Sequence, residues 1–220
     1  MFGSHQGSFM LTQDGIWLST GDEPSGKGAP ALFLDRDGVL VKEVNYLKNK
    51  EDVALEAGAA EIINWAKGWP REYAAICVTN QSGIARGLVS WPEFEAVEAE
   101  ITRQLAGKGA ALDLTIACPF HPDFTPGYGS AEDAWRKPGC RMLEYAAERL
   151  GLDLAASWLI GDKAADIEAA KRAGLKGALL VLTGYGARER EAALALAGGT
   201  FKVAVLPDLI EARGFLDSAF

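Results

Sequence analysis

The chain has 220 residues, of which 49% are hydrophobic, and a formal net charge of −8 at pH 7. This length and apolar content suffice for one well-packed core, and the acidic balance argues against broad binding to nucleic acids or anionic membranes. The sequence shows no apolar stretch of membrane-spanning length and no signal-peptide pattern, and its cysteines, Cys77, Cys118 and Cys140, are widely spaced, so we expect a reduced, cytoplasmic protein.

Residues 1–29 are polar, rich in glycine and without a regular apolar period. We expect them to form an N-terminal arm that clasps a single domain of residues 30–220 through Ile16-Trp17-Leu18. Within the arm, Gly21–Gly28 resembles a phosphate-binding P-loop, but it lacks the final Ser or Thr, carries two acidic residues and precedes a strand instead of following one. The P-loop interpretation is therefore rejected.

From residue 30 onward, apolar runs typical of buried strands alternate with helical patterns. Strands are expected near Ala31–Leu34, Ala74–Thr79, Leu112–Ala117, Ser157–Ile160, Ala178–Leu182 and Lys202–Leu206. Helices are expected over Gly58–Lys67, Trp91–Leu105, Arg141–Leu150 and Ala164–Ala173. Apolar strands connected by helices predict a Rossmann-like α/β fold, with a doubly wound, mostly parallel sheet that helices cover on both faces. The inserts are short, so we expect no large cap domain and an open site.

Two carboxylates one residue apart, Asp35 and Asp37, follow the first of these strands, and Gly38 comes next. In open parallel sheets, ligands bind at the carboxyl ends of the strands. There, one carboxylate can attack as a nucleophile while the other transfers a proton, and a divalent cation can offset their repulsion. The alternative is an ordinary Asp-Gly turn after a strand.

Three later segments place further polar groups at strand ends or helix starts. These segments are Thr79-Asn80-Gln81, Arg136-Lys137, and Asp162 with Asp166 four residues later. Each has an ordinary structural explanation, such as a helix cap, a solvated charge pair or an acid on a helix surface. Their occurrence together, and in this order, favours a single site.

In this order the segments resemble the haloacid dehalogenase superfamily of aspartate-nucleophile phosphohydrolases, whose pattern is Asp-x-Asp-Gly, a Thr or Ser after a strand, a Lys, and Gly-Asp-x-x-x-Asp. The matching residues are Asp35-Arg36-Asp37-Gly38, Thr79, Lys137 and Gly161-Asp162-Lys163-Ala164-Ala165-Asp166. The longer stretches Phe33–Val39, Val78–Gly87 and Arg136–Gly139 are similar to its heptose-bisphosphate and histidinol-phosphate phosphatase subgroup. The resemblance covers Ala31 to Tyr185, and it departs from the subgroup at Val39, where Thr is more usual.

The resemblance implies magnesium-dependent hydrolysis of phosphate monoesters through an aspartyl-phosphate. Asp35 would attack phosphorus, and Asp37 would protonate the leaving oxygen and then activate water. Thr79 and Lys137 would hold the phosphate oxygens. Mg²⁺ would be held by the Asp35 carboxylate, the Asp37 backbone carbonyl and Asp162. Four of the remaining site residues are expected to contact the substrate: Asn80, Gln81, Arg86 and Arg136. Asp166 and Lys163 are expected to contact and orient the residues that bind substrate or metal.

The substrate is expected to be a small phosphorylated metabolite: D-glycero-D-manno-heptose 1,7-bisphosphate as the first choice, and histidinol phosphate, an amino-alcohol phosphate, as the second. Neither nucleic acid nor a membrane is expected as a partner, and we expect a monomer. Two alternatives remain: a phosphotransferase of the same fold, which would favour a lid that excludes water, and a binding domain that has lost its active site. The short inserts argue against the first, and the presence of Asp35 and Asp37 argues against the second.

Structural zinc is not expected, although the resembling subgroup often braces a loop with four cysteine or histidine ligands. The corresponding positions here are Cys118, Phe120, Asp133 and Trp135, and Phe and Trp cannot ligate a metal. His121 is displaced by one residue and would supply at most one replacement, whereas structural zinc sites are closed by four ligands. We expect Phe120 and Trp135 to pack together in place of the metal.

Overall fold

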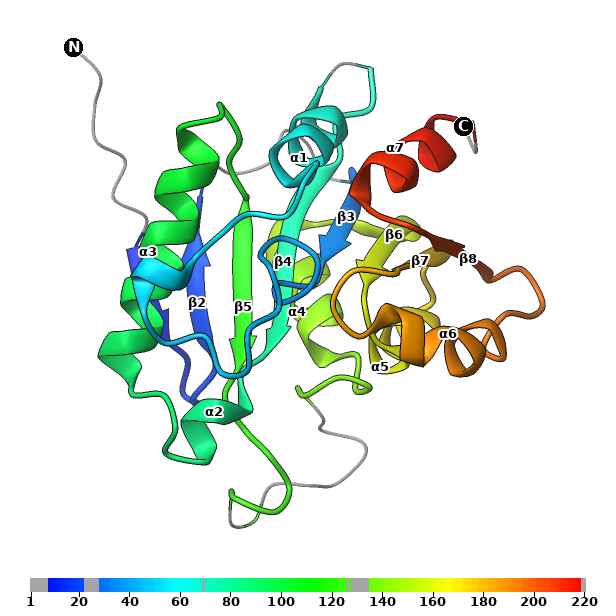
Figure 1. Ribbon diagram of the computed structural model, residues 1–220. Helices are drawn as coiled ribbons and strands as arrows, with labels where there is room; N and C mark the ends of the chain where they lie inside the picture. The colour runs from blue at the N-terminus through cyan, green and yellow to red at the C-terminus, as the bar shows by residue number, and fades with distance from the viewer. Residues whose placement is uncertain (1–7, 22–27, 69, 126, 128–134, 219–220) are drawn as a thin grey trace.

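The computed structural model describes residues 8–21, 28–68, 70–125, 127 and 135–218, which form a layered α/β structure around one sheet (Figure 1). The sheet has eight strands in the order β1-β2-β5-β4-β3-β6-β7-β8. The strands are β1 (Ser8–Leu11), β2 (Trp17–Thr20), β3 (Pro30–Leu34), β4 (Ala74–Asn80), β5 (Leu114–Cys118), β6 (Asp153–Gly161), β7 (Gly177–Val181) and β8 (Lys202–Leu206). The helices are α1 (Ala59–Lys67), α2 (Ser82–Ala85), α3 (Trp91–Ala106), α4 (Arg141–Leu150), α5 (Ala164–Arg172), α6 (Gly186–Leu194) and α7 (Leu209–Ser218), with a 3-10 helix η1 (Lys50–Asp52).

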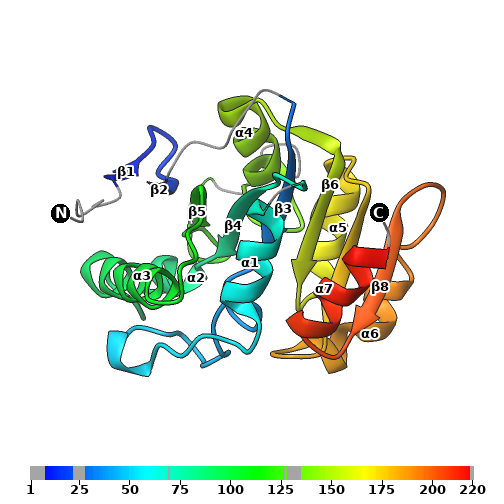
Figure 2. The ribbon, with the colours of Figure 1, turned by 90° about the horizontal axis from the view of Figure 1, so that it is seen from above.

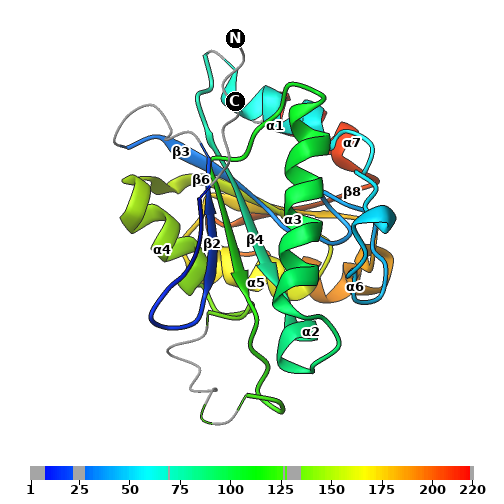
Figure 3. The same cartoon turned by 90° about the vertical axis from the view of Figure 1, so that its left-hand side faces the viewer.

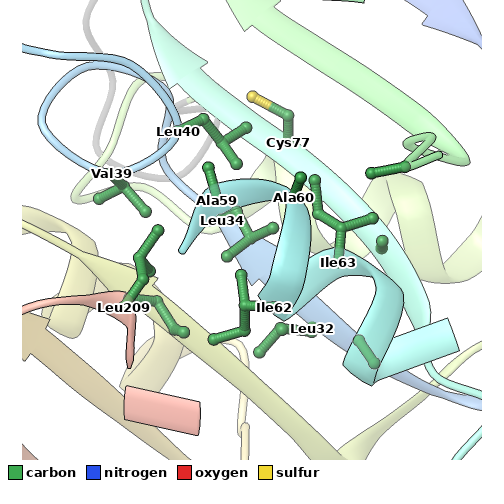
Figure 4. Close-up of a cluster of buried hydrophobic side chains, with 14 of the residues drawn as sticks. Leu32, Leu34, Val39, Leu40, Ala59, Ala60, Ile62, Ile63, Cys77 and Leu209 are labelled. Atoms are coloured by element: carbon green, nitrogen blue, oxygen red, sulfur yellow. The ribbon is translucent and has the colours of Figure 1, made fainter. Parts of the chain in front are cut away.

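The apolar side chains of the strands divide the core into two layers. On β3, Leu32 and Leu34 belong to one layer and Ala31 and Phe33 to the other, because side chains alternate along a strand. Helices α1, α3 and α7 cover the first layer, and α4 and α5 cover the second (Figures 2 and 3). Figure 4 shows part of the first layer, where α1 packs over β3 and β4. The doubly wound sheet expected from the sequence is therefore confirmed.

The sequence explains where helix α3 begins and which of its faces is buried. Ser90 and Glu93 form a capping box, in which the Ser90 N–H donates to Glu93 Oε2 at 2.8 Å. The buried face of α3 is apolar except for Glu98. No described helix is long and apolar enough to cross a bilayer.

The N-terminal segment is more regular than the sequence predicted. Strands β1 and β2 form an antiparallel hairpin, and β2 pairs with β5 so that Trp17 lies opposite Ala117. Ile16, Trp17 and Leu18 are buried, as expected of residues that clasp the domain. The Trp17 ring packs between Phe9, at a centroid distance of 5.3 Å, and Phe94 of α3, at 5.0 Å. The described part of this segment thus extends the sheet, and the division of the chain into an arm and one domain remains a prediction.

The segments between strands are short. Between β3 and β4 the chain forms a loop containing η1 and then helix α1, so the described residues include no separate cap domain. One strand begins later than predicted, at Leu114 instead of Leu112. Just before it, Asp113 uses its carboxylate to accept hydrogen bonds from the Ala75 N–H at 2.8 Å and from Lys67 Nζ at 2.6 Å.

Strand β3 is the switch point of the sheet. Its neighbours are β4 on one side and β6 on the other, and all three run parallel. In such sheets ligands bind in the crevice outside the carboxyl ends of the strands at this point. Asp35 follows β3 and Asp162 follows β6, so both carboxylates lie at this crevice.

Candidate active site

Asp35 lies at the carboxyl end of β3, where its N–H donates to Ile160 O of β6 at 2.9 Å. Its side chain is buried, and Oδ1 accepts a hydrogen bond from Lys137 Nζ at 2.8 Å. Burial alone would raise the pKa of Asp35, but the ammonium groups of Lys137 and Lys163, together with hydrogen bonds to the carboxylate, hold this pKa below its ordinary value. An ionised carboxylate in this position can act as a nucleophile or as a metal ligand.

Lys137 reaches Asp35 from the segment before α4 and is fixed at both its backbone and its ammonium. Nζ donates to Val78 O at 2.7 Å and pairs with Asp166 Oδ1 at 2.7 Å. The Asn80 side chain accepts from the Lys137 N–H at 3.0 Å and donates to the Lys137 carbonyl at 2.9 Å. Burial would lower the pKa of Lys137, but Asp166 and Asp35 raise it above its ordinary value. Asn80, a predicted substrate contact, therefore has its amide engaged in positioning Lys137.

Asp162, after β6, is fully buried and incompletely partnered. Its Oδ2 accepts from the Tyr185 N–H at 2.8 Å, whereas Oδ1 takes no hydrogen bond from any described residue. Two glycines pack against the carboxylate: a Cβ at Gly38 would lie 2.6 Å from Oδ2, and one at Gly184 would lie 2.3 Å from it. Burial, followed by the nearby Asp35 carboxylate, raises the pKa of Asp162 to about 7.

The geometry of three carboxylates fits a divalent cation. Oxygens of Asp35, Asp162 and Asp166 lie within 4.8 Å of one another. Both Asp166 oxygens already have partners, Lys137 Nζ and the Lys163 N–H, and the contact with Nζ holds the Lys137 ammonium in place. Oδ1 of Asp162 accepts no hydrogen bond from a described residue and has the Lys163 ammonium 3.6 Å away, and a hard cation would satisfy it, because a buried carboxylate oxygen without a hydrogen-bond donor is costly.

Asp37 follows Asp35 by two residues, and 17% of its side chain is exposed. Its Oδ1 accepts from Arg36 Nε at 3.1 Å, and its Oδ2 accepts from Gln81 Nε2 at 2.8 Å. Gln81 Nε2 also donates to Thr79 Oγ1 at 2.8 Å. Gln81 therefore links the two side chains for which the sequence predicts proton transfer and phosphate binding.

A cavity of about 220 Å³ lies beside Asp37. Its lining includes three cations, Arg36, Arg136 and Lys163, and Glu43 from the loop after β3. Lys163 Nζ lies 3.8 Å from Glu43 Oε2 and 4.5 Å from the centre of the Tyr185 ring. A larger cavity, of about 420 Å³, lies between α1 and α7 and has none of these residues in its lining.

Arg86 is the predicted substrate contact that the structure places apart from the lining of this cavity. Its Nη2 lies 2.9 Å from His121 Nε2, and its guanidinium lies 4.2 Å from the centre of the Phe124 ring. Arg86 thus packs against the loop that follows β5. Contact between Arg86 and substrate remains a prediction.

The four positions considered for zinc are described in part. Cys118 is buried, Phe120 and Trp135 join the apolar layer under α4, and Asp133 lies outside the described residues. The Trp135 ring packs on Tyr145 at a centroid distance of 5.3 Å. The predicted absence of zinc remains a prediction.

Two features of the site were not predicted from the sequence. One is Gly184, which follows β7, has a φ of +58° and leaves room for the Asp162 carboxylate. The other is an ion pair between Arg36 and Glu98, at 2.8 Å. A signal for Glu98 exists in the sequence, since an acid interrupts the apolar face of residues 91–105. The role of Gly184 depends on where β7 lies beside β6, which no local pattern reveals.

The chain is similar to known phosphatases. A family model described as HAD-hydrolase-like matches residues 134–212. A D-glycero-β-D-manno-heptose-1,7-bisphosphate 7-phosphatase from Mesorhizobium japonicum is 37% identical over 174 residues, which are 78% of each chain. The structure of a HAD-like phosphatase from Mesorhizobium loti superposes with a TM-score of 0.82 and 32% identity over 96% of both chains. The D,D-heptose 1,7-bisphosphate phosphatase of B. bronchiseptica, solved with magnesium and phosphate, superposes with a TM-score of 0.73 and 30% identity over 87% of this chain and 99% of that chain.

Proposed function

Because the chain belongs to the haloacid dehalogenase-like phosphatases, as its motifs predicted, we propose that it hydrolyses the 7-phosphate of D-glycero-D-manno-heptose 1,7-bisphosphate. The observation that carries this proposal is the arrangement at the switch point. Asp35 is ionised and held by Lys137 there, and Asp37 lies two residues away beside a cavity. Relatives at this level of identity over most of the chain are named for that substrate.

In the first step, a carboxylate oxygen of Asp35 forms a bond to phosphorus while the bond from phosphorus to the sugar oxygen breaks. Asp37 gives its proton to the departing oxygen, so the sugar leaves as an alcohol. The ammonium of Lys137 and the hydroxyl of Thr79 stabilise the charge on the phosphoryl oxygens. Asp166 acts through Lys137, whose ammonium it holds at 2.7 Å.

In the second step, water hydrolyses the aspartyl-phosphate. Asp37, now ionised, takes a proton from the water as its oxygen bonds to phosphorus. The bond from phosphorus to Asp35 breaks, which releases inorganic phosphate and restores the Asp35 carboxylate. Each side chain is then in its starting state.

We propose Mg²⁺ as the cofactor, held by the carboxylates of Asp35 and Asp162 and by the backbone carbonyl of Asp37. The bound ion supplies positive charge that offsets repulsion between Asp35 and the anionic phosphoryl group. Oxygen ligands suit this hard cation, and Oδ1 of Asp162, which accepts no hydrogen bond from a described residue, supports the inclusion of Asp162 among the ligands.

A small substrate with a second anionic group fits the surroundings of Asp37. Arg136 and Lys163 both line the cavity, and a second phosphate can pair with either cation. The described residues include no cap domain, which favours a metabolite that is contacted by loops. These features support a sugar bisphosphate over the end of a nucleic-acid chain.

Phosphate release from four compounds tests the proposal: heptose 1,7-bisphosphate, heptose 7-phosphate, histidinol phosphate and 5′-phosphorylated DNA, each assayed with Mg²⁺. We expect the highest kcat/KM for the bisphosphate, by about tenfold or more, because a substrate without the second phosphate cannot form the added ion pair with Arg136 or Lys163. Phosphorus NMR of the product identifies the phosphate that is lost, and Asp35→Asn controls for contaminating phosphatases. A preference for histidinol phosphate or for DNA would contradict the assignment of substrate.

A further inference from the structure

Arg36 and Glu98 form a buried ion pair that the proposed reaction does not use. Arg36 is 1% exposed and Glu98 is 5% exposed, and Arg36 Nη1 donates to Glu98 Oε1 at 2.8 Å. Moving two charges out of water is costly, and a well-packed apolar pair in their place is often at least as stable. Stability alone is therefore a weak explanation for this pair.

The guanidinium of Arg36 connects Glu98 on α3 to the carboxylate of Asp37. Nη1 faces Glu98, while Nε and Nη2 donate to Asp37 Oδ1 at 3.1 Å and 2.9 Å. Nη2 also donates to Gln81 Oε1 at 3.0 Å. The guanidinium is planar and its donors lie at fixed angles, so its position on Glu98 determines where it can hold Asp37. The Phe94 ring, 5.7 Å from Arg36 Cζ, packs against the same group.

Burial and the neighbouring charges shift the pKa values of both Arg36 and Glu98. Burial would lower the pKa of Arg36, but Asp37 and Glu98 together hold it above its ordinary value. Burial raises the pKa of Glu98, and Arg36 offsets only part of this effect. If Glu98 lost its charge, Asp37 would be the remaining carboxylate in hydrogen-bond contact with the buried guanidinium among the described residues. Asp37 would then be drawn toward Arg36 and away from the cavity.

We propose that Arg36 and Glu98 are positioning residues that orient Asp37 for protonation of the leaving group. This inference rests on the acid role of Asp37 in the proposed function. A misplacement of about 1 Å in a reacting group can cost about 100-fold in rate. Such a loss depends on the substrate, because a sugar alkoxide needs a proton in order to leave and p-nitrophenolate does not.

The test compares kcat/KM for heptose 1,7-bisphosphate with kcat/KM for p-nitrophenyl phosphate on the same preparation. The ratio of the two values does not depend on the fraction of enzyme that is folded. In Glu98→Gln, which keeps the size of the side chain and removes its charge, we expect about a 10- to 100-fold loss with the sugar phosphate and less than about threefold with the aryl phosphate. Glu98→Asp, which keeps the charge, should retain more of the ratio.

Three further variants make the result decisive. Arg36→Lys keeps the charge without the planar donor array, and we expect it to lower the ratio as Glu98→Gln does. Glu100→Gln, on the same helix, removes one charge from a surface pair with Arg103 at 2.6 Å and should leave the ratio unchanged. Asp37→Asn removes the acid and shows how far the ratio falls when no proton is donated.

Equal losses on both substrates in Glu98→Gln and Arg36→Lys, alongside a selective loss in Asp37→Asn, would overturn the inference and leave the proposed function intact. If the loss in Asp37→Asn is not selective, then Asp37 is not the acid, and both the proposed role and this inference fail.

Discussion

At the scale of single residues, Asp162 is a buried carboxylate whose ionised form a bound cation would stabilise. Its pKa is about 7 in the folded chain, above the ordinary value of 3.8, because of burial and then of Asp35. Between pH 3.8 and about 7, the folded chain binds more protons at Asp162 than the unfolded chain does. The contribution of protonated Asp162 to the free energy of unfolding is therefore complete below the lower pH and is lost as the pH rises through the upper one. A cation that binds the ionised form reverses this trend.

We therefore expect Mg²⁺ to raise Tm more at about pH 8 than at about pH 5, since at the lower pH protons compete for Asp162. Without metal, Tm of the wild type should fall relative to that of Asp162→Asn over the same rise in pH. Scanning calorimetry with chelator and then with Mg²⁺ measures both effects. An Mg²⁺-induced shift of equal size at both pH values, or one that persists in Asp162→Asn, would place the metal elsewhere.

At the scale of elements, the β1–β2 hairpin is part of the packed structure. Trp17 is 1% exposed and lies in a cluster with Phe94 and Val89, whereas Phe9 on β1 is 44% exposed. We expect Trp17→Ala to lower the free energy of unfolding by about 3–5 kcal/mol, because it leaves a large cavity, and Phe9→Ala to lower it by less than about 1 kcal/mol. Urea titrations of both variants measure these values. Equal, small effects would show that the hairpin is a loosely attached arm.

At the scale of the whole molecule, the fold could be predicted from apolar runs, because strands buried on both faces need helical crossovers. The meeting of Asp35, Thr79 and Asp162 could be predicted too, since the carboxyl ends of parallel strands share one edge. Contacts between distant loops could not. The Asn80 amide binds the backbone of Lys137, a contact that no local pattern reveals, and contact between Asn80 and substrate remains a prediction.

The N-terminal hairpin and the last two helices, α6 and α7, escaped prediction for a different reason. Their sequences have weak periodicity, and they are ordered through tertiary contacts. Trp17 of β2, for example, packs against Phe94, a residue of α3. Alone, a short hairpin of this kind is marginal in water, so its strands form only when β5 offers them an edge.

The most direct test of the account is to detect a phosphoryl group on Asp35 during turnover. The enzyme is mixed with heptose 1,7-bisphosphate labelled in the 7-phosphate and quenched with acid within milliseconds. Label on the protein is counted in one half of the sample. The other half is treated with borohydride, which reduces an aspartyl-phosphate to homoserine with release of the phosphate, and the modified position is mapped by peptide mass spectrometry. We expect label on the protein before steady state, located at Asp35, longer-lived in Asp37→Asn and absent from Asp35→Asn. A burst of inorganic phosphate with no label on the protein, or label on another residue, would contradict nucleophilic attack by Asp35.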